Sequence, residues 1–145
     1  MRLLRERLDR PIRFVGVDLS PDAIRFAQET FPDDEFHVGD GSDAIRLLED
    51  RHDEVFLASG VLSYLPENGC RDVLRAAAKS CRVLLLCDQL DHIDAQWGHE
   101  DGIYHHPFRR LFAETGWEIL GDVELSRTGH VYSSLAAHST VQQQP

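Results

Sequence analysis

The sequence has no apolar run long enough to span a membrane, so we expect no membrane association. Its first residues, MRLLRERLDRPIR, are basic but lack the apolar centre of a secretory signal. They instead match a helix, because leucines recur on one face. Cysteine is scarce: Cys70, Cys81 and Cys87 form no CxxC pair and lie within apolar runs. An odd number of cysteines without a signal peptide favours a reducing compartment, which we take to be the cytoplasm.

Positive charge is also scarce. There are 25 Asp and Glu residues against 15 Lys and Arg residues, and the formal net charge is −10. A surface this negative repels phosphate backbones, so we expect no nucleic-acid partner. The 145 residues, 42% of them hydrophobic, suffice for a single core. We therefore expect one domain over residues 1–138 and a flexible tail over residues 139–145.

Several enzyme motifs are missing. No GxSxG elbow is present, which disfavours a hydrolase, and no GxxxxGK[ST] loop indicates a P-loop nucleotidase. The densest set of potential metal ligands matches neither HExxH nor a zinc-finger spacing, so we predict no metal site and expect a solvated loop. A histidine in this loop could also act as a general base. The set comprises His99, Glu100, Asp101, His105 and His106.

What is present alternates between strand-like and helix-like patterns. Ser20 can cap a helix whose first position suits Pro21, and Gly116 is placed to end another helix. The unbroken apolar run RVLLLC suits a strand that is covered on both faces. We predict strands at 12–18, 35–39, 54–59 and 82–87, helices starting near 20, 42, 66 and 107, and an irregular polar segment at 89–104.

The C-terminal pattern differs, because residues 117–125 and 131–138 are strand-like and only SRTGH joins them. A connection that short permits only an antiparallel hairpin. The order of elements therefore predicts an α/β fold, with a mostly parallel sheet, helices on both of its faces and a closing antiparallel hairpin.

Ligands of such sheets bind outside the carboxyl ends of the strands. Asp18 ends one predicted strand and can accept hydrogen bonds from vicinal ribose hydroxyls; the alternative is a helix-capping or loop residue. Asp40 follows the next strand and can accept from an exocyclic amine, or it can be a turn residue. Ser59 and Gly60 follow a third strand, where glycine lets the backbone approach a ligand.

Three runs carry a resemblance to a known family. FVGVDLSPDAI, FHVGDGSD and DEVFLASGVLSYLP resemble, in order and spacing, the second, third and fourth strand motifs of class I S-adenosylmethionine-dependent methyltransferases. VLLLCDQLD resembles the fifth strand, and FRRLFAETGWEIL resembles the helix and strand that follow it. The resemblance covers about residues 3–138 and implies a Rossmann-like fold that binds S-adenosylmethionine.

The resemblance also implies roles for single residues. Asp18 would hold the ribose hydroxyls, Leu19 would pack against the adenine, and Asp40 would meet its amino group. No motif of the family assigns a catalytic base. The remaining implied contacts are Gly41 and Ser42 beside the adenine, Ser59, Gly60, Val61 and Leu62 bordering the methionine part and the substrate, and, more weakly, Tyr64, Trp97, Tyr104 and His105 at the substrate.

The chain departs from the family at its start, because no further strand and no GxGxG-like loop precede the strand predicted at 12–18. In the family that strand lies between those matching 12–18 and 54–59. Without that strand, its two neighbours would have unpaired backbone N–H and C=O groups. Each such group that is buried would lower stability by about 1–3 kcal/mol. Three outcomes stay open: the sequence is a fragment, the two strands close on each other, or a second copy or a partner chain covers the exposed edge.

The resemblance implies methyl transfer to a small-molecule acceptor, impaired by the missing cofactor loop. Catalysis would come mainly from positioning the reactants. The first alternative is a non-catalytic remnant, or a subunit that a partner chain completes. The second is a nicotinamide-dependent dehydrogenase, which Asp18 would suit but the closing hairpin does not.

Overall fold

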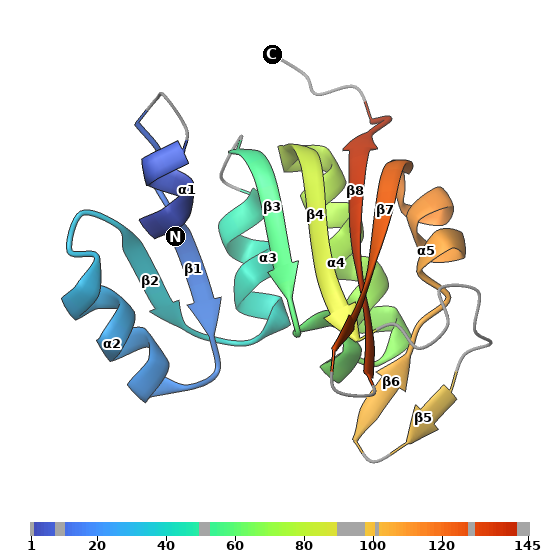
Figure 1. Ribbon diagram of the computed structural model, residues 1–145, viewed down its shortest axis with the longest axis horizontal. Coiled ribbons are helices and arrows are strands. Elements are labelled where there is room, and N and C mark those ends of the chain that lie inside the picture. The colour runs from blue at the N-terminus through green and yellow to red at the C-terminus, as the bar shows by residue number, and fades with distance from the viewer. Residues whose placement is uncertain are drawn as a thin grey trace. The chain divides into compact units, whose positions relative to one another are not determined.

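The computed structural model describes residues 2–7, 11–49, 53–89, 98–100, 102–127 and 130–141. These residues form an α/β fold that divides into two compact units, residues 1–44 and 45–145. No helix within these ranges combines the length and the apolar character that crossing a bilayer requires. Each unit is described separately below, and Figure 1 labels the elements.

Unit 1 contains a two-stranded parallel sheet in which Asp18 lies opposite Val38. The hydroxyl of Ser20 accepts a hydrogen bond from the backbone N–H of Ala23 at 3.2 Å, and Pro21 opens the helix, as predicted. The first strand is shorter than predicted. The elements are α1 (Arg2–Arg7), β1 (Val15–Asp18), α2 (Pro21–Thr30), β2 (Glu35–Val38) and the start of α3 (Gly41–Glu49).

A buried ion pair fastens α1 within unit 1. Nη2 of Arg5 lies 2.5 Å from Oδ1 of Asp34, whose side chain is 1% exposed. The guanidinium also lies over the rings of Phe14 and Phe31, 5.1 and 5.8 Å from their centroids. Asp34 in turn accepts a hydrogen bond from the backbone N–H of Phe14 at 3.0 Å. One carboxylate therefore joins α1, the entry to β1 and the loop before β2.

Unit 2 is built on a mixed sheet ordered β3-β4-β8-β7, in which β3 and β4 are parallel and the other neighbours are antiparallel. The predicted closing hairpin is therefore confirmed. The elements are β3 (Asp53–Ser59), the 3-10 turn η1 (Leu62–Tyr64), α4 (Glu67–Ser80), β4 (Cys81–Gln89), β5 (Gly98–Glu100), β6 (Ile103–His105), α5 (Phe108–Thr115), β7 (Trp117–Arg127) and β8 (His130–Ser139).

Two sequence predictions about the sheets need correction. The described strands form three sheets, the largest of them mixed, rather than one mostly parallel sheet. Residues 89–104 were predicted to be irregular, but β5 and β6 form a small antiparallel hairpin. Gly102, with φ of 80°, supplies the left-handed turn. The Asp-Gly signal was overlooked within a polar segment, and residues 90–97 and 101 lie outside the described ranges.

The core of unit 2 lies where α4 and α5 pack against the sheet (Figure 1). Trp117 opens β7, and its Nε1 donates to the carbonyl oxygen of Leu74 at 2.9 Å, so this large side chain is buried with its polar atom satisfied. The largest fully buried apolar side chains are Leu62, Leu74, Leu84, Leu86, Phe108, Leu111 and Phe112.

Only one face of β3 and β4 is covered over the described residues. Leu84 is buried, whereas Leu85 is 40% exposed and Leu57, directly opposite it on β3, is 54% exposed. The predicted cover on both faces of β4 is therefore wrong here. An apolar run reports which residues are hydrophobic, but it does not report whether a second layer is present.

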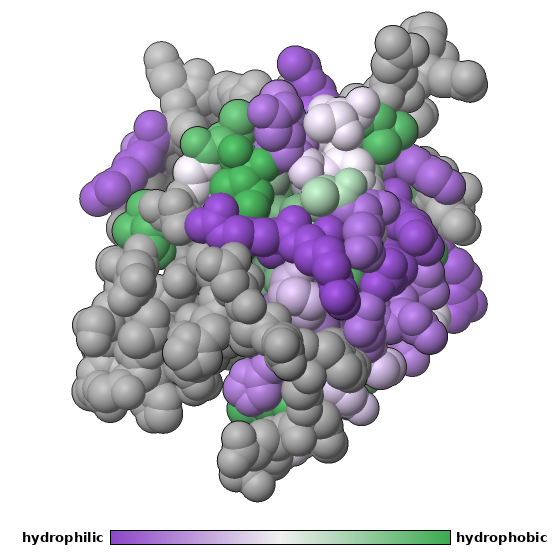
Figure 2. Space-filling view, turned by 90° about the vertical axis from the view of Figure 1, so that its right-hand side faces the viewer, coloured by the Kyte–Doolittle hydropathy of each residue, from purple (hydrophilic) through white to green (hydrophobic). Residues whose placement is uncertain are grey.

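Ion pairs connect the solvent sides of α4 and α5. Arg71 contacts Glu67 and Glu114, and Arg110 contacts the same two carboxylates. Figure 2 looks at the side of the molecule that carries α5 and shows mostly hydrophilic residues on its described surface. Arg71 and Glu67 are half-buried, whereas Arg110 and Glu114 are exposed. Ion pairs that water reaches contribute only about 0–1 kcal/mol each, so they mark a solvated face rather than a site.

Gly116 ends α5 in the left-handed conformation, with φ of 88°, as predicted. We expect Gly116→Ala to lower the free energy of unfolding by about 1–2 kcal/mol, because this conformation is unfavourable for residues with a Cβ. The added Cβ would also lie 2.6 Å from Cγ2 of Val141. Urea denaturation measures the loss. Gly121→Ala is the matched control, since a Cβ there meets nothing within 4 Å; equal losses in both variants would contradict this explanation.

Candidate functional site

Two aspartates lie at adjacent strand ends in unit 1. Asp18 is the last residue of β1, and its carbonyl oxygen accepts a hydrogen bond from the backbone N–H of Gly39 at 3.0 Å. Asp40 follows Gly39 directly, and both aspartates are exposed. Because β1 and β2 are parallel, their carboxyl ends meet at one edge, and the two aspartates lie at neighbouring strand ends.

Local hydrogen bonds orient the two carboxylates. Oδ1 of Asp18 accepts from the backbone N–H of Ser20 at 2.8 Å, and Oδ1 of Asp40 accepts from that of Ser42 at 2.7 Å. Asp40 and Asp43 also form a reciprocal capping box at the start of α3, through bonds of 3.2 and 3.0 Å. Both aspartates therefore also have the local capping or turn role that the sequence analysis gave as the alternative. A carboxylate can accept about four hydrogen bonds, so a bonded carboxylate can still accept from a ligand.

Exposed apolar side chains lie beside these carboxylates. Leu19, next to Asp18, is 73% exposed, and Val38 is also exposed at the end of β2. The turn between Val38 and Asp40 is tight: a Cβ on Gly39 would lie 2.7 Å from Cβ of Asp43, so glycine suits this position. Acceptor oxygens next to apolar surface match a ligand that has hydrogen-bond donors and a flat ring, such as a nucleoside.

Unit 2 holds the other predicted site residues. Ser59 and Gly60 are exposed at the carboxyl end of β3, and Gly60, with φ of 62°, donates its N–H to the carbonyl oxygen of Cys87 at 2.9 Å. Tyr64 is exposed, whereas Leu62 lies in the core. Tyr104 and His105, on β6, are half-buried. Trp97 lies outside the described residues.

His106 contradicts the prediction of a solvated loop. It is 2% exposed, and its Nε2 lies within hydrogen-bonding distance of two carbonyl oxygens in the turn after β3. Sequence reasoning missed this burial, although the adjoining Pro107 and Phe108, both of which are buried, were an available signal. Among the described residues, no group of three or more His, Cys, Asp or Glu side chains is arranged to hold a metal ion.

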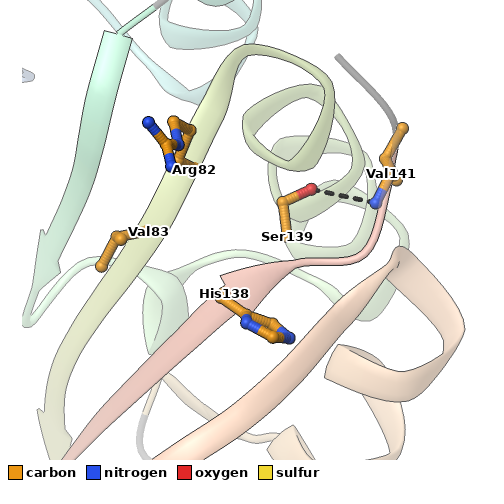
Figure 3. A pocket seen from close by; sticks show the side chains of 5 residues that line it. All are labelled: Arg82, Val83, His138, Ser139 and Val141. Carbon is orange, nitrogen blue, oxygen red and sulfur yellow. Dashed lines mark hydrogen bonds between the residues drawn. The ribbon is translucent and has the colours of Figure 1, made fainter.

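A hollow of about 370 Å³ lies at the other end of β4 (Figure 3). It is lined by Arg82, Val83, His138, Ser139 and Val141. The hydroxyl of Ser139 donates to the carbonyl oxygen of Ala78 at 2.6 Å and accepts from the N–H of Val141 at 3.2 Å. Because this hollow adjoins the amino end of β4, it is not where sheets of this kind bind their ligands.

No protein-family model matches the sequence, and no curated protein sequence matches it. Solved structures do match. The 1,6-didemethyltoxoflavin N1-methyltransferase of Burkholderia thailandensis, with bound 1,6-didemethyltoxoflavin and S-adenosylhomocysteine, aligns over 97% of this chain and 76% of its own, with a TM-score of 0.72 and 15% identity.

Two further structures match at similar levels. An O-methyltransferase family protein from Burkholderia thailandensis aligns over 96% of this chain and 46% of its own, with a TM-score of 0.67 and 18% identity. Magnesium protoporphyrin IX methyltransferase from Synechocystis PCC 6803, with bound S-adenosylmethionine, aligns over 86% of this chain and 58% of its own, with a TM-score of 0.59 and 18% identity.

The chain thus has the fold of S-adenosylmethionine-dependent methyltransferases over most of its length. It spans between 46% and 76% of the length of these three structures. At such low identities the comparison establishes the fold alone, because one fold hosts many functions.

Proposed function

We propose that this chain binds S-adenosylmethionine through its nucleoside part and takes part in methyl transfer to a small-molecule acceptor. The observation that carries the proposal is the pair of exposed carboxylates, Asp18 and Asp40, at the adjacent ends of two parallel strands. The methyltransferase fold supports the same conclusion, since two of the three similar structures hold S-adenosylmethionine or S-adenosylhomocysteine.

The chemistry of the two aspartates suits the two polar parts of adenosine. The ribose offers two vicinal hydroxyl donors, and Asp18 would accept from both. The adenine offers an amino group, from which Asp40 would accept, and Leu19 would cover the face of the ring. Gly41 and Ser42 would lie beside the ring at the start of α3. An ionised carboxylate accepts hydrogen bonds but donates none, so it matches a ligand edge that consists of donors.

S-adenosylmethionine supplies a methyl group on a positively charged sulfur, which an acceptor atom can displace directly. The residues of this chain would orient the methyl donor and the acceptor. Ser59 and Gly60, at the carboxyl end of β3, would border the methionine part. Tyr64, Tyr104 and His105, with Trp97, would border the acceptor, whereas Leu62, which the sequence also suggested, is buried in the core and would not contact it. Alignment of the reactants by itself lowers the activation free energy substantially.

The alternative is a binding subunit that a second chain completes. Among the described residues, β1 pairs only with β2 within unit 1, and β3 pairs only with β4 within unit 2, so each has one edge that no strand of its own unit covers. Exposed Val55, Leu57 and Leu85 lie on the sheet of unit 2. An additional strand from a second copy or a partner chain would satisfy such an edge and cover apolar surface. On this alternative the chain alone would bind weakly.

Calorimetric titration with S-adenosylhomocysteine tests the proposal. We expect saturable binding at one site per chain, and S-adenosylmethionine should compete for that site. At a ligand concentration 100 times the dissociation constant, binding should stabilise the fold by about 2.7 kcal/mol. The absence of both heat and stabilisation would overturn the proposal, and binding of a nicotinamide dinucleotide instead would favour the dehydrogenase.

A further inference from the structure

A buried histidine contacts the turn that follows β3. His106 lies between β6 and α5, and its Nε2 is 2.9 Å from the carbonyl oxygen of Leu62 and 3.0 Å from that of Leu65. Carbonyl oxygens only accept hydrogen bonds, so Nε2 carries a proton and donates to both. This contact joins segments that are 44 residues apart in the chain.

The imidazole is held from the other side by aromatic rings. Tyr104 stacks on it at 6.2 Å between ring centroids, and Phe108 meets it edge-on at 5.3 Å. Phe108 is fully buried and contacts Phe112 in the core. The position of the donor is therefore determined by the packed core of unit 2, and the turn is held against that fixed point.

Short-range backbone hydrogen bonds close the turn itself. Two of them, both of 3.1 Å, run from the N–H of Tyr64 to the oxygen of Val61 and from the N–H of Leu65 to the oxygen of Leu62. A 3-10 turn of this length is a weak structure by itself, because its hydrogen-bond geometry is poor. The carbonyl oxygen of Leu62 accepts from both Leu65 and His106, so the histidine supports the bond that closes the turn.

We propose that His106 is a positioning residue that holds the turn over residues 60–65 in its ligand-binding conformation. It is buried and would not touch the ligand; it acts through the turn, whose exposed residues Gly60 and Tyr64 would face the methionine part and the acceptor. This inference rests on the proposed function for the ligand, but the hydrogen bonds that carry it are independent of any ligand.

Two variants separate the hydrogen bonds from the packing. His106→Leu keeps apolar volume and removes the donor, whereas His106→Gln restores an N–H near the position of Nε2. We expect amide hydrogen exchange at Tyr64 and Leu65 to become at least tenfold faster in His106→Leu and to return close to the wild-type rate in His106→Gln. The dissociation constant for S-adenosylhomocysteine should follow the same order, with about a tenfold loss in His106→Leu.

Thr115→Val is the matched control. It removes another buried hydrogen bond of unit 2, from Oγ1 of Thr115 to the carbonyl oxygen of Leu111 at 2.6 Å, without touching the turn. This variant should lower stability but leave unchanged the amide exchange rates at Tyr64 and Leu65 and the dissociation constant for S-adenosylhomocysteine. Equal effects of Thr115→Val and His106→Leu, or no rescue by His106→Gln, would overturn the proposal.

A measurement on the unaltered protein avoids the risk that a variant fails to fold. Nitrogen-15 spectra of the imidazole should show a protonated Nε2 on His106 with a slowly exchanging proton. An unprotonated Nε2 would overturn the proposal. If the wild-type protein does not bind S-adenosylhomocysteine, the proposed function and the ligand part of this inference both fail, and the exchange rates alone decide whether His106 holds the turn.

Discussion

Asp34→Ala is expected to lower the free energy of unfolding by about 3 kcal/mol, the largest effect on stability that we predict. Removing one partner of a buried ion pair typically costs about 3–5 kcal/mol, because the other charge is left uncompensated. Here the lower end applies, since the side chain of Arg5 is 33% exposed and water screens part of its charge. The substitution also leaves the N–H of Phe14 without the carboxylate that it donates to.

Urea denaturation followed by circular dichroism measures this loss. Asp33→Ala is the matched control, because it removes the same charge from the neighbouring position, where the side chain is exposed. We expect that control to change stability by less than about 0.5 kcal/mol, as surface substitutions usually do. Similar losses in the two variants would show that the ion pair does not anchor α1 as described.

The second large effect concerns ligand binding. We expect Asp18→Ala to weaken binding of S-adenosylhomocysteine about a hundredfold, because two hydrogen bonds from ribose hydroxyls to a carboxylate are lost. Hydrogen bonds to charged groups contribute about 1.5–3 kcal/mol each, and 1.4 kcal/mol corresponds to a factor of ten. Stability should change little, since Asp18 is exposed and its described partner is the N–H of the exposed Ser20.

The control for Asp18→Ala is Asp22→Ala. Asp22 is an exposed residue on α2 that pairs with Arg25 at the surface, so this variant changes the net charge equally without altering a strand end. Its affinity should stay within about twofold of the wild-type value, because exposed charges act weakly at a distance. Equal losses in both variants would mean that net charge, rather than a ribose contact, determines the affinity.

Local chemistry explains which parts of the fold could be predicted from the sequence. Ser20 and Pro21 begin α2, and Gly116 ends α5, because caps depend on residues that are adjacent in the chain. The placement of Asp18 and Asp40 at neighbouring strand ends followed from two consecutive parallel strands. These features need no knowledge of distant contacts, and all of them are present in the structure.

Features that depend on distant contacts leave only weak signals in the local sequence. The burial of His106 requires the turn after β3, 44 residues away, to supply two acceptors. The exposure of Leu57 and Leu85 depends on what covers the sheet, which an apolar run does not encode. The pairing of β5 with β6 was signalled by Asp-Gly, but the polar composition of the segment favoured a loop. Tertiary packing overrides local preference at such positions.

The central claim is that Asp18 and Asp40 form one nucleoside-binding site, and titration of the nitrogen-15-labelled protein with S-adenosylhomocysteine tests it most directly. We predict that the backbone amide signals of residues 18–20 and 39–42 shift together and yield one dissociation constant. Those of Arg82 and Ser139, in the hollow at the other end of β4, should stay in place. Shifts centred on that hollow, or confined to one of the two strand ends, would contradict the claim.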